Sequence, residues 1–74
     1  MINYKEYITI EPAKRSGKPC IWGLRITVYD VLSYLASGMS SEEILEDLPE
    51  LTRDDILACL AYAADAEKKS LIAA

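Results

Sequence analysis

Residues 38–60 read GMSSEEILEDLPELTRDDILACL, and this stretch contains two helix starts of the same design. The hydroxyl of Ser40 can accept from the third amide of a helix, while Glu43 reaches back to the amide of Ser40. Thr52 and Asp55 have the same spacing, with aspartate as a shorter substitute for the usual glutamate. The stretch therefore predicts two capping boxes and two consecutive helices.

Apolar residues reinforce both helix starts. Met39 precedes the first cap and can pack on Ile44, and Leu51 precedes the second cap. Leu51 can pack on Ile56 in the same way, as a hydrophobic staple. Pro49 disfavours a helical conformation at the residue before it, which ends the first helix. A short helix, a tight connection and a longer helix form the outline of a helix-turn-helix.

Three helices are predicted in all, over about 28–37, 41–48 and 53–70. Thr27 can cap the first of them, and Gly38 is a favourable left-handed stop at its end. The last helix carries an apolar stripe, and its small alanines let another helix approach closely. The stripe consists of Ile56, Leu57, Leu60, Ala61 and Ala64, with Ala63 beside it.

Two short β segments precede the helices. Residues 7–10 alternate and are rich in β-branched side chains, and residues 20–27 resume a β pattern that Gly23 interrupts. The expected fold is a mainly α three-helix bundle with a short N-terminal β-hairpin. The chain of 74 residues is expected to be a single domain, with a hairpin arm over about 7–27 and a helical bundle over about 28–70.

Composition limits the classes of function. A small core with ample apolar content favours self-association or a protein partner, so a homodimer is expected. No apolar run approaches a membrane span of about 20 residues, and the N-terminus has no secretory pattern, so the cytoplasm is the expected compartment. Cys20 and Cys59 are expected to be small buried hydrophobic residues rather than a disulfide.

The charges are segregated along the chain. Residues 1–29 hold five cations against two acids, a net charge of +3, and residues 30–74 hold three cations against ten acids, a net charge of −7. Two surfaces with different partners are one interpretation, and solvated faces that keep the protein soluble are the other.

The sequence contains no pattern typical of an enzyme. It has no histidine, no Cys-x-x-Cys and no glycine-rich phosphate loop, so no catalytic residue, metal, cofactor or small-molecule substrate is expected. Asp54 and Asp55 form an adjacent acidic pair, and such pairs can hold Mg²⁺. Adjacent helix residues point about 100° apart, however, so capping is the favoured role for Asp55.

Nucleic-acid binding has a candidate set of cations. The start of the last helix has one cation, Arg53, and is otherwise acidic. Its acidic residues would repel phosphate. The loop before the second β segment is basic, and it can either clamp phosphates or be solvated. The candidate DNA contacts are Lys14, Arg15, Lys18, Arg25 and Arg53.

Residues 17–32 read GKPCIWGLRITVYDVL and are followed by Gly38-Met39-Ser40, Glu43-Ile44-Leu45, Leu48-Pro49 and Leu51-Thr52. This pattern closely resembles the small bacterial family catalogued as domain of unknown function 433, over about residues 8–64. The resemblance implies a homeodomain-like helix-turn-helix bundle with an N-terminal hairpin. Its members look like antitoxins of type II toxin–antitoxin pairs, often set beside a PIN-like ribonuclease toxin. The motif positions that carry over are Gly17, Lys18, Pro19, Gly23 and Arg25.

Two positions depart from the family pattern. Many members carry Arg where this chain has Trp22 and Thr where it has Leu24. The change at Trp22 removes a cation from the hairpin and enlarges an apolar surface that can contact a partner chain. Arg25 can bind carboxylates or phosphates bidentately, and a structural pair with Asp30 is the alternative.

The expected function is that of a non-catalytic antitoxin-like protein that binds and neutralises a PIN-like ribonuclease toxin, with operator DNA as a second contact. An acidic surface is complementary to a basic ribonuclease site. The candidate partner contacts are Trp22, Glu42, Glu46, Asp54, Leu71 and Ile72. The alternatives are a DNA-binding transcriptional regulator that acts through the basic hairpin, and a structural adaptor that only dimerises.

Overall fold

The computed structural model of the protein describes residues 2–73, with side chains from residue 2 to residue 68. Three helices and a two-stranded antiparallel hairpin confirm the mainly helical fold expected from the sequence. Two short 3-10 helices, η1 and η2, were not predicted. In chain order the elements are η1 (Tyr4–Glu6), β1 (Ile8–Ile10), η2 (Arg15–Gly17), β2 (Pro19–Ile21), α1 (Val28–Ala36), α2 (Ser41–Asp47) and α3 (Arg53–Ala73).

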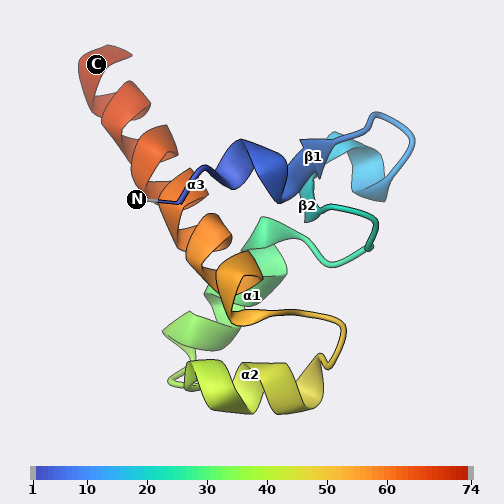
Figure 1. The fold of residues 1–74 in the computed structure, drawn as a ribbon. Coiled ribbons are helices and arrows are strands. Elements are labelled where there is room, and N and C mark those ends of the chain that lie inside the picture. The colour runs from blue at the N-terminus through green and yellow to red at the C-terminus, as the bar shows by residue number, and fades with distance from the viewer. Residues whose placement is uncertain (1, 74) are drawn as a thin grey trace.

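The long helix α3 runs along one side of the molecule (Figure 1). Helix α1 packs against α3 and β2, and α2 lies at the end of the bundle, where it contacts both other helices. The η1 segment lies along α3, while the hairpin projects to the side away from the C-terminus. The C-terminal part of α3 extends beyond the rest of the fold, so one end of this helix has few neighbours from its own chain.

The hairpin strands are shorter than predicted, with three residues each. Ile8 pairs with Ile21, Thr9 with Cys20 and Ile10 with Pro19. The chain turns immediately after β2 at Gly23, whose φ of 76° is in the region that glycine favours. It then returns through a single antiparallel bridge between Cys20 and Thr27. The second predicted β segment is therefore a short strand followed by a tight turn.

Both predicted capping boxes are present, and the predicted cap Thr27 forms a third box with Asp30. In each one the hydroxyl accepts from the third helical amide, and the carboxylate accepts from the amide of the capping residue. Gly38 ends α1 with a φ of 99°, as predicted. The pairs, with their two donor–acceptor distances, are Thr27 and Asp30 (3.0 and 3.0 Å), Ser40 and Glu43 (3.2 and 2.9 Å), and Thr52 and Asp55 (3.2 and 2.8 Å).

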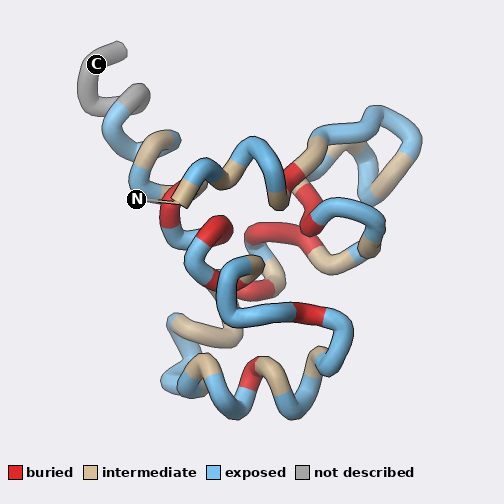
Figure 2. The backbone as a smooth tube through the Cα atoms, viewed as in Figure 1, coloured by how far each residue is buried: buried red, intermediate tan, exposed pale blue. Residues whose placement is uncertain are grey.

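One hydrophobic core lies where the hairpin and the three helices meet (Figure 2). Ile44, Leu51 and Ile56 are buried, and Met39 packs against this core, so all four residues of the two predicted staples belong to it. Cys20 and Cys59 are buried free thiols, as predicted. The buried residues that form this core cluster are Ile8, Ile21, Val28, Val31, Ile44, Leu51, Ile56, Ala58 and Cys59.

Only part of the apolar stripe predicted on α3 enters the core. Ile56 and Ala61 are buried, but Leu57 and Leu60 remain 46% and 44% exposed. Helix α1 and the η1 segment occupy two sides of α3, and the stripe residues on the third side face solvent.

Among the described residues, no helix is long and apolar enough to cross a membrane.

Candidate interaction surfaces

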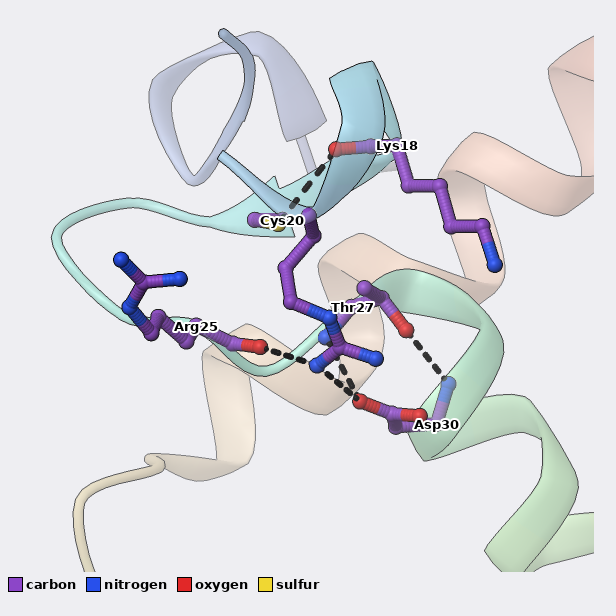
Figure 3. A network of polar contacts seen from close by, with 6 residues as sticks. Lys18, Cys20, Arg25, Thr27 and Asp30 are labelled. Carbon is purple, nitrogen blue, oxygen red and sulfur yellow. Dashed lines mark hydrogen bonds and ion pairs between the residues drawn. The ribbon is translucent and has the colours of Figure 1, made fainter. Parts of the chain in front are cut away.

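Arg15 connects the hairpin loop to the start of α1. Its Nη1 atom donates to the backbone carbonyl of Arg25 at 2.6 Å and lies 3.4 Å from Oδ2 of Asp30. Figure 3 shows the carbonyl of Arg25 and the carboxylate of Asp30 directed toward one point, while the Arg25 guanidinium points away. The structural partner of Asp30 is therefore Arg15, and the alternative that paired Arg25 with Asp30 is wrong. Gly17 and the rest of η2 bend the loop, and this bend brings Arg15 within reach of α1.

The Asp30 carboxylate serves two roles at once. Partial burial pushes its pKa upward, but four favourable interactions outweigh this effect and lower the pKa below its usual value. These interactions are hydrogen bonds from the amide and the hydroxyl of Thr27, the positive charge of Arg15 and a hydrogen bond from Arg15. The charged form of Asp30 thus stabilises both the cap of α1 and the loop.

The five candidate DNA contacts do not form one free basic surface. Lys14 pairs with Glu11 at 3.1 Å, and Arg15 is occupied as described above. Arg53 lies at the start of α3 and pairs with Glu42 of α2 at 3.0 Å. Within the described part of the chain, Lys18 and Arg25 make no ion pair, and Lys18 extends toward α3 (Figure 3).

Acidic side chains surround α2 and the start of α3. The sequence-predicted Glu42, Glu46 and Asp54 are all exposed here, and Asp47 and Glu50 join them. Asp54 lies close to Tyr7: the Tyr7 hydroxyl has a raised pKa, first because of partial burial and then because of the Asp54 charge. All three acidic partner candidates are thus exposed, with Glu42 and Glu46 on α2 and Asp54 in the first turn of α3.

Trp22 is separate from this acidic surface. Its side chain is 69% exposed at the turn that follows β2, and Ile10 at the other end of the hairpin is 60% exposed. Trp22 lines a depression of about 320 Å³ together with Thr9, Glu11 and Lys14. The hairpin therefore presents an aromatic ring beside one ion pair.

The sequence did not predict a groove that lies between α1 and α3. It has a volume of about 340 Å³, with Lys18 at its edge and Tyr29, Leu32 and Tyr62 among its lining residues. Tyr29 is 71% exposed. The sequence position of Tyr29 could have indicated this groove. Tyr29 directly follows the buried Val28 and falls outside the apolar stripe of α1.

The exposed side of α3 is apolar. A shallow depression of about 450 Å³ is lined by Leu57, Leu60, Ala61 and Ala64, and Ile2 from the N-terminal segment lies at its edge.

The partner candidates Leu71 and Ile72 lie outside the described side chains. Over the described side chains, no three histidine, cysteine or carboxylate residues form a metal-binding group.

Comparisons with known proteins agree on one family. Residues 8–63 match the family model described as "Protein of unknown function (DUF433)". The chain is 37% identical over 59 residues to "Uncharacterized protein y4eO" of Sinorhizobium fredii (strain NBRC 101917 / NGR234), covering 80% of this chain and 27% of that protein. The chain thus spans about a quarter of the length of that curated relative.

A solved structure shares the fold. It is described as the crystal structure of a DUF433 member protein from Anabaena variabilis ATCC 29413, and it superposes with a TM-score of 0.79 at 28% sequence identity. The match covers 90% of this chain and 70% of that one. The match therefore covers nearly the whole chain and not only the motif of residues 17–32.

Proposed function

This chain belongs to the DUF433 family of proteins of unknown function, and we propose that it is a non-catalytic antitoxin-like protein whose partner is a PIN-like ribonuclease toxin. In this proposal it binds the toxin and blocks access of RNA to the toxin active site. The observation that carries the proposal is the exposed acidic surface formed by α2 and the first turn of α3. Any enzyme that binds RNA needs a cationic surface around its active site, and an acidic protein can cover that surface.

The acidic surface is available for a partner. Glu42 is partly neutralised by Arg53, but Glu46 and Asp54 make no ion pair with another described residue. Their side chains project from helices whose starts are held by capping boxes. A helix backbone held in this way loses little conformational entropy on binding, which favours recognition of a cationic site.

Trp22 supports a protein partner in a different way. Tryptophan is enriched among the residues that dominate binding energy at protein interfaces. In this fold Trp22 is 69% exposed, so its ring adds little to the core. We assign it as an apolar contact with the partner, separate from the acidic surface.

The DNA-binding alternative has weaker support. Of its five candidate cations, Lys14, Arg15 and Arg53 already pair with carboxylates of the same chain. Lys18 and Arg25 remain, and contacts from two cations to phosphates contribute little to DNA affinity. We therefore place operator DNA second, as a contact that would require several copies of the chain.

The test uses the protein encoded next to this chain, which this proposal expects to be a ribonuclease. The two proteins are produced together, and we expect them to copurify at equal stoichiometry, with this chain inhibiting cleavage of a single-stranded RNA. The variant Glu42→Gln with Glu46→Gln should weaken inhibition about tenfold or more, and added salt should reduce the difference from the wild type.

Glu6→Gln is the matched control, because Glu6 is an exposed acid in η1, away from α2. It should inhibit as well as the wild type does. Absence of a complex, together with no loss of ribonuclease activity, would refute the antitoxin assignment. Binding of the promoter fragment without any effect on the ribonuclease would favour the DNA-binding regulator.

A further inference from the structure

We propose that the groove between α1 and α3 binds a small organic monocarboxylate, whose apolar body lies between the helices and whose charged end meets Lys18. This site goes beyond the proposed function, because neither the acidic surface nor Trp22 takes part in it. The groove has a volume of about 340 Å³, which is within the range of small-ligand sites. Such sites combine a mainly apolar lining with a few polar groups that fix the orientation of the ligand.

The lining of the groove is mainly apolar and comes from three elements. Helix α1 contributes Tyr29 and Leu32, and α3 contributes Tyr62 and Ala63. Pro19, the first residue of β2, also lines the groove. The side chain of Ala63 ends at Cβ, so it leaves space between the two helices. A ligand in this space would contact side chains of both helices and of the hairpin.

Tyr29 forms an exposed wall of the groove. Its side chain is 71% exposed. Among the described residues, it makes no ring pair and no hydrogen bond through its hydroxyl. The face of such a ring can pack on an apolar ligand. Binding would remove apolar surface from water on both the ligand and Tyr29, which is favourable.

Lys18 supplies the charge that selects a carboxylate. It is exposed at the edge of the groove, and its side chain extends toward α3 (Figure 3). Within the described part of the chain, its ammonium group makes no ion pair. Its backbone is held in place, since its amide donates to the carbonyl of Arg15 at 3.2 Å and its carbonyl accepts from the Cys20 thiol at 3.3 Å. An available cation beside an apolar lining is complementary to a carboxylate on an apolar body.

Two other depressions lack this combination. The depression beside Trp22 contains Lys14, but Lys14 already pairs with Glu11 at 3.1 Å. The depression on the exposed side of α3 is lined by apolar residues alone. The groove between α1 and α3 joins an apolar lining to one cation that is not paired within the described residues. One cation matches one carboxylate, and this match points to a monocarboxylate.

The test measures the binding of three probes to the full chain by two-dimensional NMR of isotopically labelled protein. Phenylpropionate has both the charge and the apolar body, phenylpropionamide has only the body, and acetate has only the charge. We expect phenylpropionate to bind with a dissociation constant on the order of 1 mM and to shift the amide signals of Tyr29, Leu32 and Ala63. Phenylpropionamide should bind about fivefold more weakly, and acetate should leave these signals unchanged.

Variants locate the site. Lys18→Met keeps an apolar stem and removes the charge, so it should lower the affinity for phenylpropionate to that for phenylpropionamide. Ala63→Leu should fill the groove and abolish the binding of both probes. Arg25→Met is the matched control, because Arg25 also makes no ion pair within the described residues and does not line the groove. It should bind phenylpropionate as the wild type does, and circular dichroism verifies that each variant keeps its helices.

Several results would overturn the proposal. One is the absence of any signal shift in the wild type at about 20 mM phenylpropionate. Equal affinity for phenylpropionate and its amide would make the groove an apolar docking surface for a protein. Acetate that binds as tightly as phenylpropionate would indicate a simple anion site, such as one for the phosphates of DNA. Binding that survives Ala63→Leu unchanged would place the ligand outside the groove.

Discussion

Arg15 lies with its Nη1 atom 3.4 Å from Oδ2 of Asp30, and this contact joins the hairpin loop to the first turn of α1. The same atom donates to the backbone carbonyl of Arg25 at 2.6 Å. One cation thus joins the hairpin loop both to the turn after β2 and to the start of α1, and Asp30 also closes the cap of α1. The basic loop that suggested a DNA contact is in this respect a structural clamp.

Replacing Arg15 tests the clamp. We expect Arg15→Ala to lower the free energy of unfolding by about 1 kcal/mol, since the ion pair is more than one third exposed and is screened by solvent. Urea unfolding followed by circular dichroism measures the change. Lys18→Ala is the control and should leave stability within about 0.5 kcal/mol, because Lys18 has no ion pair within the described part of the chain. Equal effects of the two substitutions would contradict the clamp.

The capping boxes give a second prediction. Ser40→Ala should cost about 1 kcal/mol of stability, because it removes the acceptor for the amide of Glu43 at the start of α2. Ser41→Ala at the next position should be nearly neutral, since alanine is a better helix former. Thermal unfolding of the two variants in the same buffer makes the comparison. A neutral Ser40→Ala would show that α2 is held by core packing alone.

Acid should destabilise the protein through the capping carboxylates. The pKa of Asp30 lies below its usual 3.8 because hydrogen bonds from Thr27 and the Arg15 charge outweigh the effect of burial. The pKa of Glu43 lies below its usual 4.5, chiefly because the amide of Ser40 donates to its carboxylate. For such groups the unfolded state binds more protons at low pH, so their contribution is complete above the usual values and is lost as pH falls through the lower folded pKa.

Stability measured against pH checks this linkage. The free energy of unfolding should fall progressively below about pH 4.5 in the wild type. In Asp30→Asn this fall should be shallower, and the stabilities of the two proteins should converge in strong acid, where Asp30 is protonated in both states. A constant difference between them down to strong acid would show that the charge of Asp30 is not the cause.

The thiols should be unreactive in the folded protein. Burial, followed by the charge of Asp55, raises the pKa of Cys59 to about 12, so the thiolate is scarce at neutral pH. Cys20 is 1% exposed, and its thiol donates to the carbonyl of Lys18. A thiol reagent at neutral pH should modify both residues only as fast as the chain unfolds. Ser37→Cys adds an exposed thiol that should react at once, and rapid modification of Cys59 in the native protein would contradict its burial.

Trp22 provides an optical test of partner binding. It is the single tryptophan of the chain, and its 69% exposure predicts emission typical of indole in water. Addition of the proposed ribonuclease partner, with its own tryptophans replaced, should shift the emission to shorter wavelengths. Trp22→Ala should leave the unfolding free energy within about 0.5 kcal/mol and weaken the complex. Unchanged emission in a complex shown to form would place Trp22 outside the interface.

Local signals in the sequence predicted most of the secondary structure. The capping pairs Ser40 with Glu43 and Thr52 with Asp55 each span three residues, so their hydrogen bonds depend on the local helix geometry. The stop at Gly38 likewise depends on the backbone freedom of one residue. The sequence therefore determined that there would be three helices, where each would start and where the first would end.

Tertiary structure decided what these elements do with their side chains. Leu57 and Ile56 are neighbours on α3 with similar hydropathy, and only the packing of α1 and η1 determines that Ile56 is buried and Leu57 is exposed. Arg15, rather than Arg25, binds Asp30 because the loop geometry brings Arg15 across from a distance of fifteen residues. Both outcomes depend on contacts between segments distant in sequence, and residue periodicity carries no information about which of several apolar or charged side chains such a contact will select.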